Sequence, residues 1–303
     1  MESAAPPELS VTVDSIPMLE AAIKAGADAL LFGGESYGHQ ILSPDCYRKA
    51  AELAQRAGTR IFFHTPRIVR DREQTALESI LDAAAACRPD GVYVHNIGTL
   101  HLVRRQTQLP IYGDFSLITA NRQTLEFLKE YGVHGATLSP ELSWAQVAAL
   151  AKESPLPLEC IVHGRLELMV SSYCAAGSFL GGLGDGPCSQ PCKEGPYALR
   201  DRKQAIFPLA MDQFCRMHVL NSKILSMLPY TPDFAPAGIH RIRIEGRAME
   251  EAELSAVIRA YQTFKTCRPE DMERHRERIR ALEGNSCTRG HYFRGAFQST
   301  EFH

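Results

Sequence analysis

The first 160 residues alternate between two kinds of segment. Short runs rich in β-branched and other apolar residues are each followed by a longer stretch in which apolar positions recur every three or four residues. The first pattern is typical of buried strands and the second of amphipathic helices. Seven strands are therefore expected here, at residues 9–14, 28–35, 59–64, 91–95, 109–114, 135–139 and 158–163. An eighth, at 239–245, comes only after a long interruption and is again followed by an amphipathic stretch.

Eight strands that alternate with helices predict a parallel α/β sheet, and eight is the number at which such a sheet closes into a TIM-like (β/α)8 barrel. An open doubly wound sheet is the alternative. Each predicted strand ends in a polar or ionisable side chain: Asp14, Glu35, His64, His95, Asp114, Ser139, His163 and Glu245. In a barrel these ends meet at one mouth, where active sites are built, although loop composition alone also favours Asp and Ser. The pattern favours the barrel.

The interruption between the seventh and eighth strands, residues 164–237, is the least regular part of the chain. Its glycine-rich centre, residues 175–187, shows no apolar period. A loop this long inside a compact domain is usually functional or disordered, and bound metal can order such a segment. We expect residues 1–265 to form the barrel with this insertion, and residues 266–303 to form a charged C-terminal helix and tail.

Composition adds one unusual feature, nine cysteines, to an otherwise ordinary chain with a net charge of -2. That charge provides no chain-wide positive field for nucleic acid or anionic membranes. The start of the chain does not resemble a secretory signal, and no apolar run approaches the roughly 18 residues that span a membrane. We therefore expect a cytoplasmic protein without a membrane span. In that compartment cysteines are more often metal ligands, catalytic groups or small buried residues than disulfides.

Four of the cysteines fall within the insertion, as Cys174-x13-Cys188-x3-Cys192-x22-Cys215. Four thiolates can bind either a zinc ion or an iron–sulfur cluster. Zinc sites usually contain two short cysteine pairs, and this segment has one, so the spacing favours a cluster. Zinc, and structural or redox-active cysteines, remain as alternatives. Cys46, on the first turn of a predicted helix near the barrel mouth, is an alternative to Cys215 as fourth ligand.

Several segments resemble the peptidase U32 family, also called collagenase-like proteases. They are residues 21–35, 138–144, 158–174, 186–197 and 288–295. The specific part is a Glu-x-x-x-His-Gly element followed by a cysteine, then Gly-x-Cys-x-x-x-Cys and a further downstream cysteine. Together these segments cover most of the chain.

The resemblance implies a (β/α)8 barrel with four cysteines that hold a 4Fe-4S cluster. Better-understood members are oxygen-independent hydroxylases. Some act as heterodimers of paralogous subunits on the aromatic ring of a ubiquinone precursor, and others hydroxylate a pyrimidine base in transfer or ribosomal RNA, with prephenate proposed as the oxygen donor. Cys174, Cys188, Cys192 and Cys215 match motif cysteines. Glu167 stands where many relatives have a further cysteine, so either Glu167 or Cys46 is a candidate replacement ligand.

Three functions follow from these features. As a hydroxylase, the protein would use His64, His95, Asp114 and His163 at the mouth as acid–base or positioning groups for a small aromatic substrate or an RNA base. A peptidase is the second candidate, although no nucleophile set or helical His pair is visible. The third is a non-catalytic partner subunit. From residue 268 onward Arg alternates with Glu or with aromatic residues, which fits either RNA stacking or a solvated helix with a packed tail.

Overall fold

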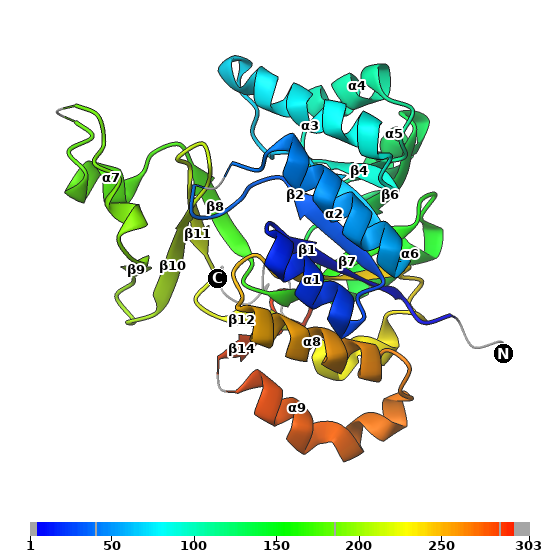
Figure 1. Ribbon diagram of the computed structural model, residues 1–303. Coiled ribbons are helices and arrows are strands. Elements are labelled where there is room, and N and C mark those ends of the chain that lie inside the picture. Colours follow the sequence, from blue (N-terminus) through cyan, green and yellow to red (C-terminus); the bar gives the residue numbers. More distant parts are fainter. Residues whose placement is uncertain (1–4, 40, 185, 285, 294–303) are drawn as a thin grey trace, which may run out of the picture.

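The computed structural model describes residues 5–39, 41–184, 186–284 and 286–293. All eight predicted parallel strands are present, and they form the centre of the molecule (Figure 1). They are β1 (Glu8–Val13), β2 (Ala29–Gly33), β3 (Arg60–His64), β4 (Gly91–Val94), β5 (Ile111–Gly113), β6 (Val133–Thr137), β7 (Leu158–Gly164) and β13 (Arg241–Glu245). Each pairs in parallel with its neighbours, in the order of the chain.

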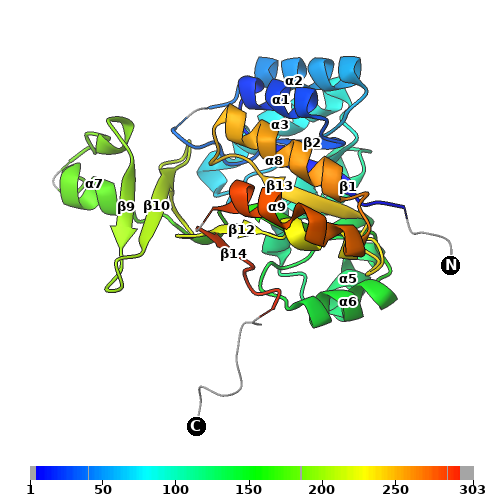
Figure 2. The ribbon, with the colours of Figure 1, turned by 90° about the horizontal axis from the view of Figure 1, so that it is seen from below.

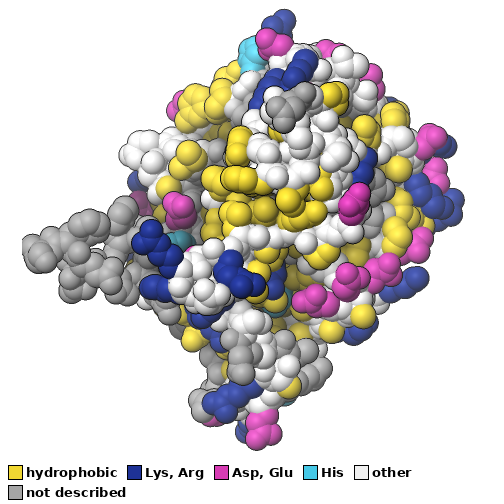
Figure 3. All heavy atoms as spheres, turned by 90° about the vertical axis from the view of Figure 1, so that its left-hand side faces the viewer, with side chains coloured by type: hydrophobic (Ala, Val, Ile, Leu, Met, Phe, Trp, Pro, Cys, Tyr) yellow, Lys and Arg dark blue, Asp and Glu magenta, His cyan; other side chains and the backbone are white. Residues whose placement is uncertain are grey.

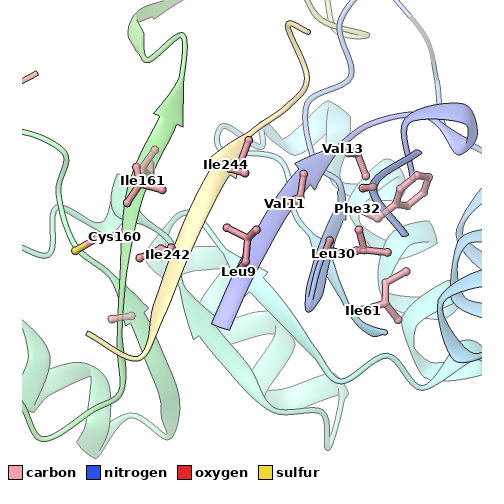
Figure 4. Packing of buried hydrophobic residues seen from close by; sticks show 14 of the residues in the cluster. Leu9, Val11, Val13, Leu30, Phe32, Ile61, Cys160, Ile161, Ile242 and Ile244 are labelled. Carbon is pink, nitrogen blue, oxygen red and sulfur yellow. The ribbon is translucent and has the colours of Figure 1, made fainter. Parts of the chain in front are cut away.

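The sheet closes through β13, which lies between β7 and β1 (Figure 4). Ile242 is in register with Cys160 on one side and with Leu9 on the other. The predicted (β/α)8 barrel is therefore confirmed, and an open doubly wound sheet is excluded.

Helices cover the outside of the barrel (Figures 1 and 2). They are α1 (Ile16–Ala25), α2 (Pro44–Ala57), α3 (Gln74–Cys87), α4 (Ile97–Gln106), α5 (Arg122–Glu130), α6 (Trp144–Glu153) and α8 (Glu251–Phe264). Their boundaries follow local chemistry. At the start of α2, for example, the Ser43 side chain accepts a hydrogen bond from the Cys46 amide, and Pro44 occupies the first helical position. Gly58 ends the same helix in the left-handed conformation, with φ of 67°.

Alternate strand residues point to two different environments. Leu9, Val11 and Val13 of β1 point outward and pack in the main hydrophobic core with the helices. Ser10, one residue from Leu9, points inward, where its hydroxyl donates to the Glu159 carboxylate at 2.6 Å. The barrel interior is therefore partly polar. A small second cluster inside the barrel consists of Ala29, Leu31, Phe62 and Tyr93, with Tyr112 packed against it.

The insertion forms its own antiparallel sheet beside the barrel (Figures 1 and 2). Its strands are β8 (Glu167–Ser171), β9 (Tyr197–Arg200), β10 (Ile206–Met211) and β11 (Met217–Leu220), in the order β8-β11-β10-β9. A short helix, α7 (Ala175–Leu180), contributes Ala176 to a small core with Met211, Met217 and Val219. The sequence did not predict this sheet, because its strands are short, and β8, β9 and β10 are mostly exposed or half-buried and lack a clear alternation of apolar and polar residues.

The chain leaves the insertion through β12 (Ile224–Ser226), which pairs with β7, and a 3₁₀ helix over Leu228–Asp233. After α8, the predicted charged helix is divided into a 3₁₀ helix at Pro269–His275 and α9 (Arg276–Glu283). A two-residue strand, β14 (Cys287–Thr288), then pairs with β12. Tyr292 is buried, and its hydroxyl donates to the Ile161 carbonyl at 2.8 Å, so this part of the tail packs on the barrel. The predicted tail beyond 293 lies outside the described residues.

Candidate metal centre and barrel mouth

The four cysteines of the insertion line a single cavity of about 240 Å³. Cys174 caps α7, and Cys188 and Cys192 follow on the connection to β9. Cys215 lies between β10 and β11. All four are free thiols. Cys46 and Glu167, the alternative ligands considered from the sequence, do not line this cavity.

The backbone wraps closely around two of the sulfurs. The Gly177 amide donates to Cys174 Sγ at 3.3 Å, and the Gln190 amide donates to Cys188 Sγ at 3.3 Å. A Cβ atom on Gly181 would lie only 2.6 Å from Cys188 Sγ, and one on Gly177 would lie 3.2 Å from it. The glycine-rich sequence of the insertion is therefore explained at these two positions, because a larger residue would meet a sulfur.

A histidine that the sequence did not single out completes the cavity lining. His39 Nε2 lies 3.1 Å from Cys192 Sγ, and His39 Nδ1 lies 3.6 Å from Cys215 Sγ. His39 belongs to the loop between β2 and α2, and Cys46, the alternative ligand, follows in the first turn of α2. No spacing or motif in the sequence distinguishes His39 from the other histidines, since its place beside the cysteines depends on the fold.

Burial raises the pKa of Cys192, and the neighbouring Cys174 raises it further. The pKa of Cys215 is raised by burial, then by Asp212 and by Cys174. Thiols that hinder one another's ionisation need a cation before they are all thiolates.

Three of the four predicted mouth residues lie together inside the barrel. His64, His95 and Asp114 have ligand atoms within 4.8 Å of one another. His64 Nε2 lies 3.6 Å and His95 Nδ1 3.8 Å from the Asp114 carboxylate. The same carboxylate binds the fully buried Arg243, with oxygen–nitrogen distances of 2.6 and 3.3 Å. Arg243 therefore balances the charge of Asp114. A metal cation bound by the trio would be repelled by the nearby guanidinium.

The pKa values of this trio follow from burial and from Arg243. Burial lowers the pKa of His64 well below its usual range, and His95 lowers it further. Burial also lowers the pKa of His95, in spite of Asp114. Burial alone would raise the pKa of Asp114, but Arg243 and the two histidines hold it well below its usual range. Both imidazoles are therefore neutral and Asp114 is ionised at neutral pH.

His163, the fourth predicted residue, is not part of this trio. It is buried at the end of β7, where its Nδ1 lies 3.4 Å from the Tyr261 hydroxyl. Burial lowers the pKa of His163 to about 4. None of the four predicted mouth residues lines the cavity at the barrel mouth, which has a volume of about 30 Å³.

That mouth cavity is lined instead by arginines, acids and aromatic rings: Tyr37, Arg67, Phe115, Arg165, Glu167 and Arg247 contribute to it. Arg67 lies over the Phe115 ring, with 5.0 Å from guanidinium carbon to ring centre, and Arg247 lies over the Tyr37 ring at 5.4 Å. These arginines follow the strand ends by a few residues, or lie in the insertion, so the residues that end the strands do not include them.

Glu35, also at a strand end, accepts the Arg67 amide and lies 3.7 Å from the Arg247 guanidinium. Burial acts to raise the pKa of Glu35, but Arg67, His95 and Arg247 hold it at about 2.

A buried chain of charged groups connects the mouth to the cysteine cavity. Arg67 binds Glu167, and Glu167 binds His218. His218 Nε2 contacts the Asp212 carboxylate at 3.2 Å, which in turn lies 3.6 Å from Arg216 in the cavity wall. Burial acts to lower the pKa of His218, but Asp212 and Glu167 raise it above its usual value. The two cavities are therefore neighbours joined by one network of ion pairs.

The insertion also carries many of the exposed apolar side chains. Seen from the side of the insertion, hydrophobic groups gather across the middle of the molecule, with Lys and Arg below them (Figure 3). Among the exposed large hydrophobic residues, those of the insertion are Leu168, Met169, Tyr173, Phe179, Leu180, Leu183, Leu199 and Ile206. In the part of the chain that the structure describes, no helix is long and apolar enough to cross a membrane.

A protein-family model described as peptidase family U32 matches residues 14–301. The chain belongs to peptidase family U32. The expected family membership is therefore confirmed over most of the sequence, including the barrel and the cysteine-bearing insertion.

Relatives of this U32 chain carry different names at similar identity. It is 23% identical over 274 residues to a collagenase of Porphyromonas gingivalis, covering 84% of this chain and 64% of the relative. It is 23% identical over 265 residues to tRNA hydroxylation protein P1 of Bacillus subtilis, covering 84% and 62%. It is 25% identical over 246 residues to a 23S rRNA 5-hydroxycytidine synthase of Escherichia coli, covering 80% and 36%. The chain thus spans less than two thirds of each of these relatives.

Proposed function

We propose that this U32 protein is a 4Fe-4S-dependent, oxygen-independent hydroxylase that acts on a pyrimidine base of RNA, with a small aromatic ring as the alternative substrate. The observation that carries the proposal is the convergence of Cys174, Cys188, Cys192 and Cys215 on one cavity beside the barrel mouth. The names of the relatives that hydroxylate tRNA or rRNA support the RNA substrate.

The spacing of the sulfurs favours a cluster over a single zinc ion. In a tetrahedral zinc site with bonds of about 2.3 Å, all four sulfurs lie within about 3.8 Å of one another. Among the described histidine, cysteine and acidic residues, the group with ligand atoms within 4.8 Å is the trio inside the barrel, not the four cysteines. A 4Fe-4S cluster binds each thiolate to a different iron, so it suits a wider set of sulfurs.

The residues of the mouth suit an aromatic, anionic substrate. The bound cluster would supply electron transfer at the border of the mouth. Arg165 donates to the carbonyls of Asn221 and Ser222, at 3.0 and 2.9 Å, and forms no ion pair with the described carboxylates. It can therefore bind a phosphate of RNA, or a carboxylate of a donor such as prephenate. The Tyr37 and Phe115 rings also line this cavity, and aromatic rings are the usual stacking partners of an RNA base.

A thiol peptidase is the second candidate, because His39 contacts Cys192. A catalytic thiol needs a lowered pKa. Burial and the neighbouring Cys174 raise the pKa of Cys192 instead. The arrangement therefore favours metal binding over peptide hydrolysis.

Metal analysis tests the proposal directly. We expect the protein purified without oxygen to contain about four iron and four sulfide per chain. Changing Cys188→Ala or Cys192→Ala should remove the iron, whereas Cys267→Ala, a half-buried cysteine outside the cavity, should leave it unchanged. Stoichiometric zinc without iron would contradict the cluster.

Nucleoside analysis then tests the substrate. A strain that lacks the gene should lose a hydroxylated pyrimidine from its tRNA or rRNA, as measured by mass spectrometry. The wild-type gene should restore that nucleoside, and Cys188→Ala should not. If RNA is unchanged and a hydroxylated quinone precursor is lost, the substrate is the small aromatic ring. A chain that binds a second U32 subunit but has no turnover of its own would instead be a partner subunit.

A further inference from the structure

The four cysteines of the cavity are not equivalent. Cys174, Cys188 and Cys192 lie within one short segment, and the first two accept hydrogen bonds from backbone amides. Cys174 is buried, and Cys188 and Cys192 are half-buried, whereas Cys215 is exposed. Cys215 also belongs to a separate turn, between β10 and β11. Three of the sulfurs therefore come from one segment, and the fourth and most exposed one comes from another.

His39 reaches the same side of the cavity from the barrel. Its loop is held against the insertion by a β-bridge between Tyr37 and Asp212 and by the Gly38 amide, which donates to the Met211 carbonyl at 2.9 Å. His39 itself has a φ of 63°, in the left-handed region that few non-glycine residues adopt. These contacts direct the imidazole into the cavity, where Nε2 lies 3.1 Å from Cys192 Sγ and Nδ1 lies 3.6 Å from Cys215 Sγ. Binding to iron would separate Nε2 from Cys192 Sγ, because a cluster binds its ligands through different irons.

We infer that His39, and not Cys215, is the fourth ligand, so that the proposed cluster is held by His39, Cys174, Cys188 and Cys192. This inference rests on the proposed function, since it assumes that the cavity holds a cluster. Imidazole nitrogen is an established ligand of protein-bound iron, and histidine replaces cysteine on one iron of Rieske centres. The ligand then comes from the barrel itself, and metal binding fastens the insertion to the loop after β2.

The ligand type has a chemical consequence. A neutral imidazole in place of a thiolate makes the cluster one unit less negative, and histidine ligation raises the reduction potential of iron–sulfur centres. Cys215 remains as a free thiol at the cavity, which makes it the natural control position.

The experiment compares four proteins reconstituted with iron and sulfide without oxygen: wild type, His39→Ala, His39→Cys and Cys215→Ser. We expect wild type and Cys215→Ser to hold equal iron, and His39→Ala to lose at least one iron in four. His39→Cys should hold a full cluster whose reduction potential is lower than that of wild type. Pulsed electron paramagnetic resonance of the reduced wild type should detect a strongly coupled nitrogen that changes when histidine is labelled with ¹⁵N. The same coupling should be absent in His39→Cys.

Two results would overturn the inference while leaving the proposed function intact. Full iron in His39→Ala, combined with loss of iron in Cys215→Ser, would identify Cys215 as the ligand. A nitrogen coupling too weak for direct ligation would reduce His39 to a hydrogen-bond donor to Cys192. Wild-type protein without iron would contradict the proposed function itself, so the two failures are distinguishable. Circular dichroism of each variant checks that the barrel is folded.

Discussion

At the scale of single residues, the interior of the barrel is organised by buried charge. Arg243 is fully buried and binds Asp114, with the carboxylates of Glu159 and Glu245 at 3.7 and 3.3 Å from its Nε. Removing one member of such a group leaves an unpaired buried charge, which typically costs about 3–5 kcal/mol. The ionisable groups of this interior therefore determine both the stability of the barrel and its response to pH.

His163 gives the clearest pH prediction, because burial lowers its pKa to about 4. In the unfolded chain a histidine binds its proton near pH 6.5, so between these values the unfolded state binds more protons and folding weakens as pH falls. From pH 7.5 to pH 5 this group should cost about 2 kcal/mol of stability. Urea unfolding of wild type and His163→Gln at both pH values measures the free energy of unfolding. Between pH 7.5 and pH 5, the unfolding free energy of the variant should fall by about 2 kcal/mol less than that of wild type. Equal losses in the two proteins would contradict the prediction.

The sequence predicted the interior residues only in part. Strand ends pointed to His64, His95 and Asp114, and the structure brings these three together. Arg243 and Glu159 were missed because they lie within strands rather than at their ends. The alternation of Arg and Ile in β13 was the available signal, since a strand buried on both faces has no other reason to alternate in this way.

At the scale of elements, α7 and the connection after it position three cysteines and contribute little to a hydrophobic core. Only Ala176 and Gly177 of this six-residue helix are buried. Isolated helices this short are unstable in water. The order of the segment therefore depends on its contacts with the sheet and, under the proposed function, on the bound metal.

A matched pair of glycines tests this role. Alanine at Gly181 would place Cβ 2.6 Å from Cys188 Sγ, whereas alanine at Gly184 meets nothing within 4 Å. We expect Gly181→Ala to retain less than half of the wild-type iron after reconstitution and Gly184→Ala to retain all of it. Iron and sulfide assays measure the loading. Equal loading of the two variants would show that the close packing around Cys188 is unimportant.

Elements of the barrel were predictable because each one repeats the same local chemistry, with a buried run, a helix cap and an amphipathic face. The insertion follows no such rule. Residues of β8, β9 and β10 are mostly exposed or half-buried, so their sequence carries little periodic signal. The cysteine spacing pointed to residues that line one cavity, but not to His39, and the sheet that positions them depends on contacts between distant segments.

At the scale of the whole molecule, the barrel and the insertion are two units joined by specific contacts. The main core belongs to the barrel, and the insertion has only the small core around Met211 and Met217. The ion pairs from Arg67 to Arg216 and the Tyr37–Asp212 bridge join the two units. Their stabilities should therefore differ.

Removal of the metal should open the insertion and leave the barrel folded. Hydrogen–deuterium exchange, measured before and after loss of the metal to oxygen or a chelator, should speed up by at least tenfold within residues 167–220. Exchange in β1 to β6 should be unchanged, because their core does not contain the cysteine cavity. The Cys188→Ala variant should behave as the metal-free protein without treatment. Loss of protection across the whole barrel would contradict this separation.

The closing strand of the barrel also constrains the order in which the chain can fold. Glu8 on β1 and Arg241 on β13 bind each other although 233 residues separate them, and 82 residues separate the paired Leu158 and His240. Contacts between residues that are distant in sequence slow folding. The entropy cost of closing a loop falls by about 0.6 kcal/mol each time the length of the loop is halved. A folded insertion leaves a shorter flexible loop between β7 and β13 than an open one. We therefore expect removal of the metal, which should open the insertion, to slow closure of the barrel as well.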